Sequence, residues 1–171
     1  MNKQKGAALL VALLILVAIS LLGISAMKTS MFSSRVSTGM QADAMVFEGA
    51  ESAIVEAYEE LDGMSTINLS NFLGGDVMTR CVVSDNPRKD GLCAGADFMD
   101  SRDLIKAHST SQVNGFRLIS GAQISSTGNG GTFVDYQVEI SGNSEMAAFN
   151  MGDLHVQELL KRGILPSAEI Q

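Results

Sequence analysis

The sequence predicts an α+β protein, with one long N-terminal helix and a small domain that contains antiparallel strands. Three observations support this fold class. Residues 7–26 form an uncharged apolar run, and residues 44–61 repeat apolar side chains at three- and four-residue steps. Residues 115–120 and 132–140 alternate between apolar and polar side chains, as strands do. With 171 residues, the chain allows one modest domain beyond the N-terminal segment.

The apolar run, AALLVALLILVAISLLGISA, contains no charge and no Pro. At about 1.5 Å per residue, a helix of this length spans roughly the 30 Å hydrocarbon core of a bilayer. Only a helix satisfies the backbone polar groups within one segment in lipid, so we expect a membrane helix. Lys3, Lys5 and the amino terminus precede the run, and Lys28 is the first charge after it. The positive-inside rule therefore favours a cytoplasmic N-terminus by a small margin.

Three arrangements of this segment are open. A secretory signal peptide would be cut near Gly23-Ile24-Ser25, but secretory apolar regions usually span about 7–15 residues and this run is longer. An uncleaved membrane anchor would keep Met1 as its N-terminal residue. In the third arrangement the cut lies before the run: Lys5-Gly6-Ala7-Ala8-Leu9-Leu10 resembles a type IV prepilin leader, and such proteins are cut after the Gly and keep the apolar helix. We favour the third, because Gly6 has no side chain to obstruct a peptidase and a full span follows it directly.

The helical pattern continues past the membrane run to Leu61. Its predicted packing face comprises Ala44, Phe47, Ala50, Glu51, Ile54, Ala57, Tyr58 and Leu61. The opposite face carries Asp43, Glu48, Ser52, Glu56, Glu59, Glu60 and Asp62. Gly63 is a typical residue for the end of a helix. Gly39 and Gly49 each lower the stability of the helix by about 1 kcal/mol relative to Ala. We expect this second half of the helix, residues 28–62, to pack on the small domain, residues 63–171.

Within the small domain, the sequence predicts loops and short strands. Residues 68–75 have the composition of a loop, and residues 78–83 have that of a short strand. Residues 97–112 are expected to form a short helix or a loop. The flexible sequence SSTGNGG separates the two strand signals, and Gly142-Asn143 predicts a second turn. Four residues of the second strand are expected to share one face: Val134, Tyr136, Val138 and Ile140.

The C-terminal stretch, residues 153–164, fits two structures. As a helix it has Asp153 as its cap and Gly163 after its last turn. As a strand, Leu154, Val156 and Leu160 would face inward. The local pattern leaves both open.

The two cysteines, Cys81 and Cys93, enclose a turn-like sequence with Pro87 and Gly91. If the domain is exported to an oxidising compartment, we expect the two cysteines to form a disulfide. In the chain-entropy model this bond raises the free energy of unfolding by roughly 3 kcal/mol. Two reduced thiols are the alternative. Zinc would need further ligands, and His108 and His155 are the only histidines. The oxygens of Asp85, Asn86 and Asp90 do not have the spacing of an EF-hand calcium loop.

Composition argues against several function classes. The formal net charge is −7, and loss of Lys3 and Lys5 would make it more negative, so nucleic-acid binding is not expected. The chain has no Trp for base stacking. No nucleophile is set beside a base, and no Walker or dinucleotide motif is present. We therefore expect no catalytic residue, no cofactor and no metal.

Three stretches together resemble the N-terminal region of PilX-type minor pilins: GAALLVALL from Gly6, LGISAM from Leu22 and VFEGAESA from Val46. The resemblance implies a type IV pilin-like fold, in which the soluble half of the long helix packs on a small antiparallel sheet. It also implies a role in starting the assembly of type IV pili with other minor pilins and the major pilin, and incorporation near the pilus tip. Cleavage between Gly6 and Ala7 by the prepilin peptidase, and N-methylation of Ala7, would follow.

The same resemblance implies a location and further partners. The chain would first cross the inner membrane once, in contact with lipid and the assembly platform, with its C-terminal domain in the periplasm, and would then enter the pilus. One residue departs from the pattern: major pilins carry Glu at the fifth mature position, which is Val11 here. The K-type pseudopilins of secretion systems also lack this Glu, but they are much larger. A periplasmic scaffold or binding protein with a single membrane anchor is the other alternative.

Overall fold

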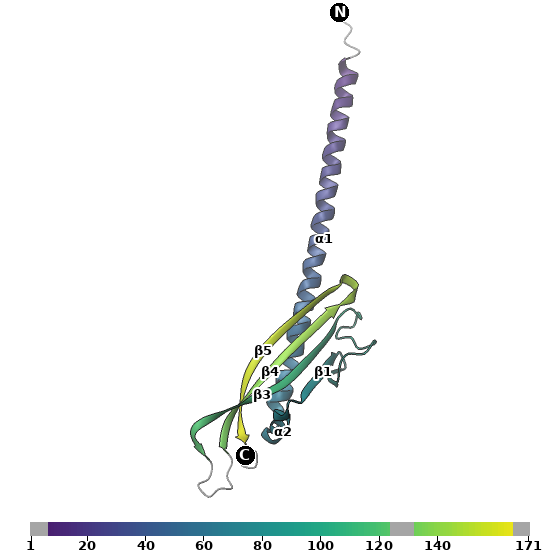
Figure 1. The fold of residues 1–171 in the computed structure, drawn as a ribbon. Helices are drawn as coiled ribbons and strands as arrows, with labels where there is room; N and C mark the ends of the chain where they lie inside the picture. The colour runs from purple at the N-terminus through teal and green to yellow at the C-terminus, as the bar shows by residue number, and fades with distance from the viewer. Residues whose placement is uncertain (1–6, 124–131, 166–171) are drawn as a thin grey trace, which may run out of the picture. The chain divides into compact units, whose positions relative to one another are not determined.

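The computed structural model describes residues 7–123 and 132–165. Helix α1 (Ala7–Gly63) is followed by a short α2 (Thr66–Asn71) and a 3-10 turn, η1 (Phe72–Gly74). The strands are β1 (Val77–Val83), β2 (Asn86–Asp90), β3 (Lys106–Gln123), β4 (Thr132–Met146) and β5 (Met151–Leu165), with a second 3-10 turn, η2 (Ala147–Phe149), before β5 (Figure 1). The chain divides after Gln41 into two compact units.

The strands form one antiparallel sheet with the order β2-β1-β3-β4-β5, and the second half of α1 packs on one face of it (Figure 1). The α+β, pilin-like fold class is therefore confirmed. Strands at 78–83, 115–120 and 132–140 are confirmed as well, although β3 and β4 are longer than predicted. The predicted SSTGNGG turn lies outside the described residues.

Three local predictions are wrong. The short helix or loop expected over residues 97–112 is a loop only up to Ile105, because β3 begins at Lys106 and pairs with both β1 and β4. Gly142-Asn143 is not a turn: β4 runs through it, and Gly142 serves the close approach of α1 described below. The loop expected over residues 68–75 begins instead with α2, whose cap Ser65 accepts a hydrogen bond from the N–H of Asn68 at 3.4 Å.

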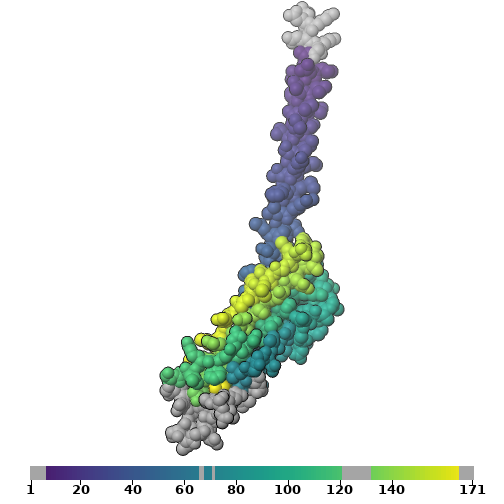
Figure 2. All heavy atoms as spheres, viewed as in Figure 1, coloured from purple at the N-terminus to yellow at the C-terminus, as the bar shows by residue number. Residues whose placement is uncertain are grey.

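Residues 153–164, whose conformation the sequence leaves open, belong to the strand β5. The expected inward face of that strand is wrong, because Leu154, Val156 and Leu160 are all more than half exposed. Their neighbours on the strand have partners on α1 instead: Lys161 donates to the carbonyl oxygens of Leu61 and Asp62, 2.5 and 2.6 Å away, at the end of the helix. Figure 2 shows β5 in yellow along one side of the sheet face that α1 does not cover.

The face of α1 that packs on the sheet is made largely of small residues. It comprises Ala42, Val46, Gly49, Ala50, Ala53, Ile54, Ala57 and Leu61. Four of the predicted packing residues are in this set, but Ala44 is exposed, and Phe47 and Tyr58 are about half exposed. The sheet comes too close for large side chains: a Cβ on Gly142 would lie 2.4 Å from the carbonyl oxygen of Ala50. Gly49 therefore allows close packing here, rather than merely weakening the helix.

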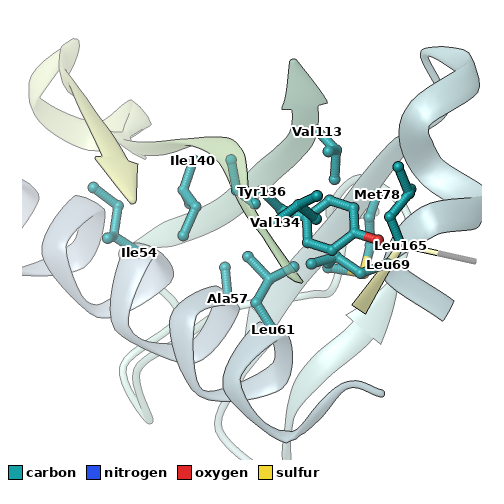
Figure 3. Close-up of a cluster of buried hydrophobic side chains, with 11 residues drawn as sticks. Ile54, Ala57, Leu61, Leu69, Met78, Val113, Val134, Tyr136, Ile140 and Leu165 are labelled. Atoms are coloured by element: carbon teal, nitrogen blue, oxygen red, sulfur yellow. The ribbon is translucent and has the colours of Figure 1, made fainter. Parts of the chain in front are cut away.

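The largest buried cluster lies between the last turns of α1 and the sheet. Its members are Ile54, Ala57, Leu61, Leu69, Met78, Val113, Val134, Tyr136, Val138, Ile140 and Leu165. Figure 3 shows the Tyr136 ring surrounded by aliphatic side chains from α1, α2 and the strands. The shared inner face predicted for Val134, Tyr136, Val138 and Ile140 is confirmed, since all four are buried. Their burial favours packing of α1 on this face of β4.

Candidate functional site

The first candidate site is the N-terminal part of α1. Residues 7–38 are exposed throughout, so the apolar run contributes nothing to the core of the small domain. Within the described ranges, α1 is the one helix long and apolar enough to cross a membrane. An exposed aliphatic run of this length is unfavourable in water and favourable in lipid or against other apolar helices. The segment is therefore suited to a membrane and to helix-helix assembly.

The two hydroxyl groups in the apolar run, residues 7–26, are satisfied within the helix. Ser20 Oγ donates to the carbonyl oxygen of Leu16 at 2.8 Å, and Ser25 Oγ donates to that of Leu21 at 3.0 Å. Just beyond the run, Thr29 Oγ1 donates to the carbonyl oxygen of Ser25 at 3.1 Å. Because these side chains bond to the preceding helical turn, they need no water, and burial of the run in lipid leaves neither of its two hydroxyls unpaired.

Two residues named by the resemblance lie at the start of this helix. Ala7 is its first residue, while Gly6 lies outside the described residues. Val11 is one turn further on, and the residue is 52% exposed on the helix surface. No acidic residue occurs in α1 before Asp43, so no neighbouring side chain replaces a carboxylate at position 11.

Comparison with known protein families identifies this segment. Residues 5–55 match the PilX N-terminal family. The resemblance to PilX-type pilins is therefore confirmed over the N-terminal third of the chain. The PilX match includes the whole apolar run and continues into the part of α1 that packs on the sheet, through Gly49 to Ile54. No match was found among curated proteins or solved structures.

The PilX match supports a coarse functional statement. The match suggests a minor pilin related to the type IV pilus, and PilX-type pilins are structural rather than catalytic proteins. The apolar helix near the N-terminus is consistent with a single membrane anchor. Among the described residues, no three His, Cys, Asp or Glu side chains are grouped so that they could hold a metal ion.

The second candidate site is the β1–β2 hairpin. A disulfide joins Cys81 in β1 to Cys93 just after β2, with their Cα atoms 5.0 Å apart. The turn-like sequence between them includes the strand β2. Cys81 is fully buried. The bond therefore fastens the short edge strand β2 to the rest of the sheet.

Ion pairs fasten the same hairpin to α1. The Arg80 guanidinium binds both carboxylate oxygens of Glu60, with Nε 2.8 Å from Oε2 and Nη2 2.8 Å from Oε1, and it also contacts Asp90. Hydrogen bonding to Glu60 raises the pKa of Arg80, although burial opposes the shift. Arg88 pairs with Glu56 at 3.0 Å and with Glu59 at 2.7 Å. The sequence pattern places these glutamates on the helix face opposite the predicted packing face, and it cannot show that two arginines lie across from them.

The loop after the disulfide is held by two carboxylates. Asp97 accepts hydrogen bonds from Lys89 Nζ at 2.7 Å and from the N–H of Ala94 at 2.8 Å, and both lower its pKa. Burial tends to raise the pKa of Asp100, but the N–H groups of Ile105, Leu104 and Arg102 outweigh it and the net shift is downward. Because Asp97 and Asp100 have hydrogen-bond partners within the protein, no ligand is needed to explain why acidic residues occur at these positions.

We predict that the disulfide acts on stability. Replacing both cysteines with Ala should lower the free energy of unfolding of the small domain by roughly 3 kcal/mol, because the unfolded chain loses a cross-link. Urea unfolding of the purified full chain in detergent, followed by circular dichroism, measures the change. Thiol alkylation of the non-reduced wild-type protein should label neither Cys81 nor Cys93. Labelling of both in protein taken from the periplasm would count against the bond.

Proposed function

We propose that this protein is a minor pilin that takes part in starting the assembly of type IV pili and is incorporated near the pilus tip. It crosses the inner membrane once, with its N-terminus in the cytoplasm and its C-terminal domain in the periplasm. Residues 1–6 are the leader, 7–27 the membrane and assembly helix, 28–62 its amphipathic continuation and 63–171 the periplasmic region. Its partners are other minor pilins, the major pilin, the prepilin peptidase, membrane lipid and the assembly platform.

The observation that carries the proposal is the PilX match over a helix whose first half is apolar and exposed. A helix that serves only as an anchor needs lipid solubility and no more. A pilin helix must also leave the bilayer and pack against other helices, and an uncharged aliphatic surface suits both surroundings. The match extends from this segment into the packed part of α1, as expected if one helix links assembly to the small domain.

Processing is the first step of the proposed mechanism. Cleavage between Gly6 and Ala7 removes Lys3 and Lys5 and leaves the amine of Ala7, the target of methylation, at the start of α1. The cytoplasmic basic residues are then no longer attached to the helix. Since moving a charged side chain through the bilayer is unfavourable, their removal lowers the barrier to extracting the helix into a fibre.

Val11 supports a position at or near the tip. In a pilus that grows from the membrane, each incoming subunit lies below one that is already in place. A Glu at position 11 of an incoming subunit would meet the N-terminal amine of the subunit above. The first subunits have none above them, and an unpaired carboxylate in an apolar surrounding costs several kcal/mol. Val11 avoids this cost, although Val also suits any membrane helix.

The proposal predicts where the protein lies and how it responds to Val11→Glu. Immunogold labelling of sheared pili should place the protein at one end of the fibre, in small amounts. Val11→Glu should not increase the number of pili per cell, counted by electron microscopy, because an initiating subunit gains no partner for the new carboxylate. Uniform labelling along the shaft, at an abundance near that of the major subunit, would contradict the tip position.

A further inference from the structure

Strand β5 forms one edge of the sheet, and in the described part of the chain no strand lies on its other side (Figure 1). It pairs with β4 over all 15 of its residues without a bulge, and it contains no Pro. A long, regular edge strand presents a row of unpaired backbone N–H and C=O groups, and proteins usually interrupt such edges with Pro or a bulge. The free edge of β5 is therefore suited to pairing with another strand.

The row of β5 side chains on the open face of the sheet is largely aliphatic. Its four aliphatic residues are between 40 and 60% exposed: Leu154, Val156, Leu160 and Ile164. The β4 residues paired with the first three of them are polar: Asn143, Ser141 and Gln137. The chain's own sheet thus gives this row little apolar cover. Contact with a second apolar surface would remove the row from water, which is favourable.

Two charged residues interrupt the row, and only one of them has a partner of opposite charge. Arg162 Nε donates to Oδ1 of Asp135 at 3.0 Å, while 68% of the arginine side chain stays exposed. Glu158 is exposed, and the β4 residue paired with it is another acid, Glu139. Within residues 7–123 and 132–165, Glu158 forms no ion pair. Because like charges directly opposite each other are unfavourable, a cation on the free side of β5 would stabilise this carboxylate.

A second copy of β5 supplies this cation and covers the aliphatic side chains. When two β5 strands pair antiparallel about a twofold axis at Leu160, each Glu158 lies opposite Arg162 of the other copy. In the same register each Val156 lies opposite Ile164, and Leu160 lies opposite itself. The neighbouring registers that keep these side chains on one face place Glu158 opposite Leu160 or Ile164 instead. The row is therefore complementary to itself in the register centred on Leu160.

We propose that two copies of this protein associate through antiparallel pairing of their β5 edges, centred on Leu160. The pairing joins the two five-stranded sheets into one, with the aliphatic rows side by side on its open face. Glu158 and Arg162 form two reciprocal ion pairs across the twofold axis. Cross-strand pairs of opposite charge and pairs of aliphatic side chains both stabilise such a junction.

The pairing also fixes the relative direction of the two chains. Near the start of β5, the ring of His155 packs on Phe47 of α1. Later in the strand, Lys161 contacts Leu61 at the end of the helix, so β5 runs in the same direction as the packed half of α1. A twofold axis perpendicular to the sheet reverses both elements. Two chains anchored in the same bilayer therefore cannot pair in this way, whereas chains in separate detergent micelles can.

Cysteine cross-linking of the full chain in detergent tests the pairing and its register. Cys81 and Cys93 are bonded to each other, so an added cysteine is the single free thiol. In Leu160→Cys the two added thiols face each other across the twofold axis, and mild oxidation should give a covalent dimer on a non-reducing gel. Val156→Cys is the matched control from the same row. Its two thiols would lie about 26 Å apart along the paired strands, too far for a disulfide, so we expect about tenfold less dimer.

Glu158→Arg tests the charge pairing. It places two arginines opposite each other at both ends of the junction, so the dimer measured by analytical ultracentrifugation should be about tenfold weaker than that of the wild type. Since Glu158 is exposed and has no ion-pair partner in the described part of its own chain, the variant should fold, as checked by circular dichroism. Glu48→Arg is the matched control: it makes the same charge change at an exposed position of α1 and should keep the wild-type dimer.

Four results would overturn the proposal. The first is a wild-type chain that stays monomeric at every protein concentration accessible in detergent. The second is the absence of a covalent dimer in Leu160→Cys. The third is equal cross-linking of Leu160→Cys and Val156→Cys, which is expected if the apolar helices alone hold the chains together. The fourth is a dimer that Glu158→Arg leaves unchanged.

Discussion

Gly142→Ala should destabilise the small domain by about 3 kcal/mol, a large effect for a single methyl group. A Cβ at this position would lie 2.4 Å from the Ala50 carbonyl oxygen and 2.7 Å from Cγ1 of Ile54. The first of these atoms belongs to the backbone of α1, so the helix itself must move away from β4. The movement would loosen the buried contacts along the packed half of the helix.

Urea unfolding of the full chain in detergent measures this effect. Gly95→Ala is the matched control: it is the same change in a loop where an added Cβ meets no atom within 4 Å, and it should shift stability by no more than about 0.5 kcal/mol. If Gly142→Ala unfolds at the same urea concentration as the wild type, the close approach of helix and sheet is wrong.

Gly6→Leu should leave the chain in the inner membrane with its leader attached and should abolish its contribution to pilus assembly. A bulky side chain at the cleavage position obstructs the peptidase, and the leader keeps Lys3 and Lys5 fixed on the cytoplasmic side. Membrane fractionation and counts of surface pili measure the result. We expect loss of the chain from the pilus fraction, rather than a graded decrease.

Gly23→Leu is the control for this experiment. It makes the same chemical change inside the apolar run, at a position where an added Cβ meets no atom within 4 Å. It should leave processing intact if the cut follows Gly6, and it should block processing if the segment is a secretory signal cut near residues 23–25. Normal piliation by Gly6→Leu, with failure of Gly23→Leu, would therefore reverse the assignment of the leader.

The N-terminal segment could be predicted from the sequence because its properties are local. The length of the apolar run and its lack of charge are properties of consecutive residues, so the spanning helix needs no knowledge of the rest of the fold. The pairing of Cys81 with Cys93 was predictable for a similar reason, since the chain contains only two cysteines. The helix end at Gly63 also follows from local chemistry, although Lys161 reinforces it from a distant strand.

The packing face of α1 was only partly predictable, because hydrophobic periodicity favours large apolar side chains. Phe47 and Tyr58 fit the period, yet the sheet lies too close to accommodate them on that face. The distance is set by Gly142, which is far away in the sequence and which by itself suggests a turn. The role of small residues in the contact between α1 and the sheet can be seen only when both the helix and the sheet are known.

The orientation of β5 could not be predicted for a related reason. Its aliphatic residues Leu154, Val156 and Leu160 suggest an inward row, but they lie on the open face of the sheet. His155 and Lys161 turn towards α1 because Glu51 and the helix end supply partners for them. The pattern of one strand carries no information about charged groups about a hundred residues earlier in the chain.

The N-terminus of the wild-type protein shows whether this chain is processed and used as a minor pilin. Mass spectrometry of the protein purified from the membrane and pilus fractions should find a chain that begins at Ala7 and carries one methyl group on its amine. A chain that retains Met1, or one that begins beyond Ser25, would show that the protein is not processed as a pilin.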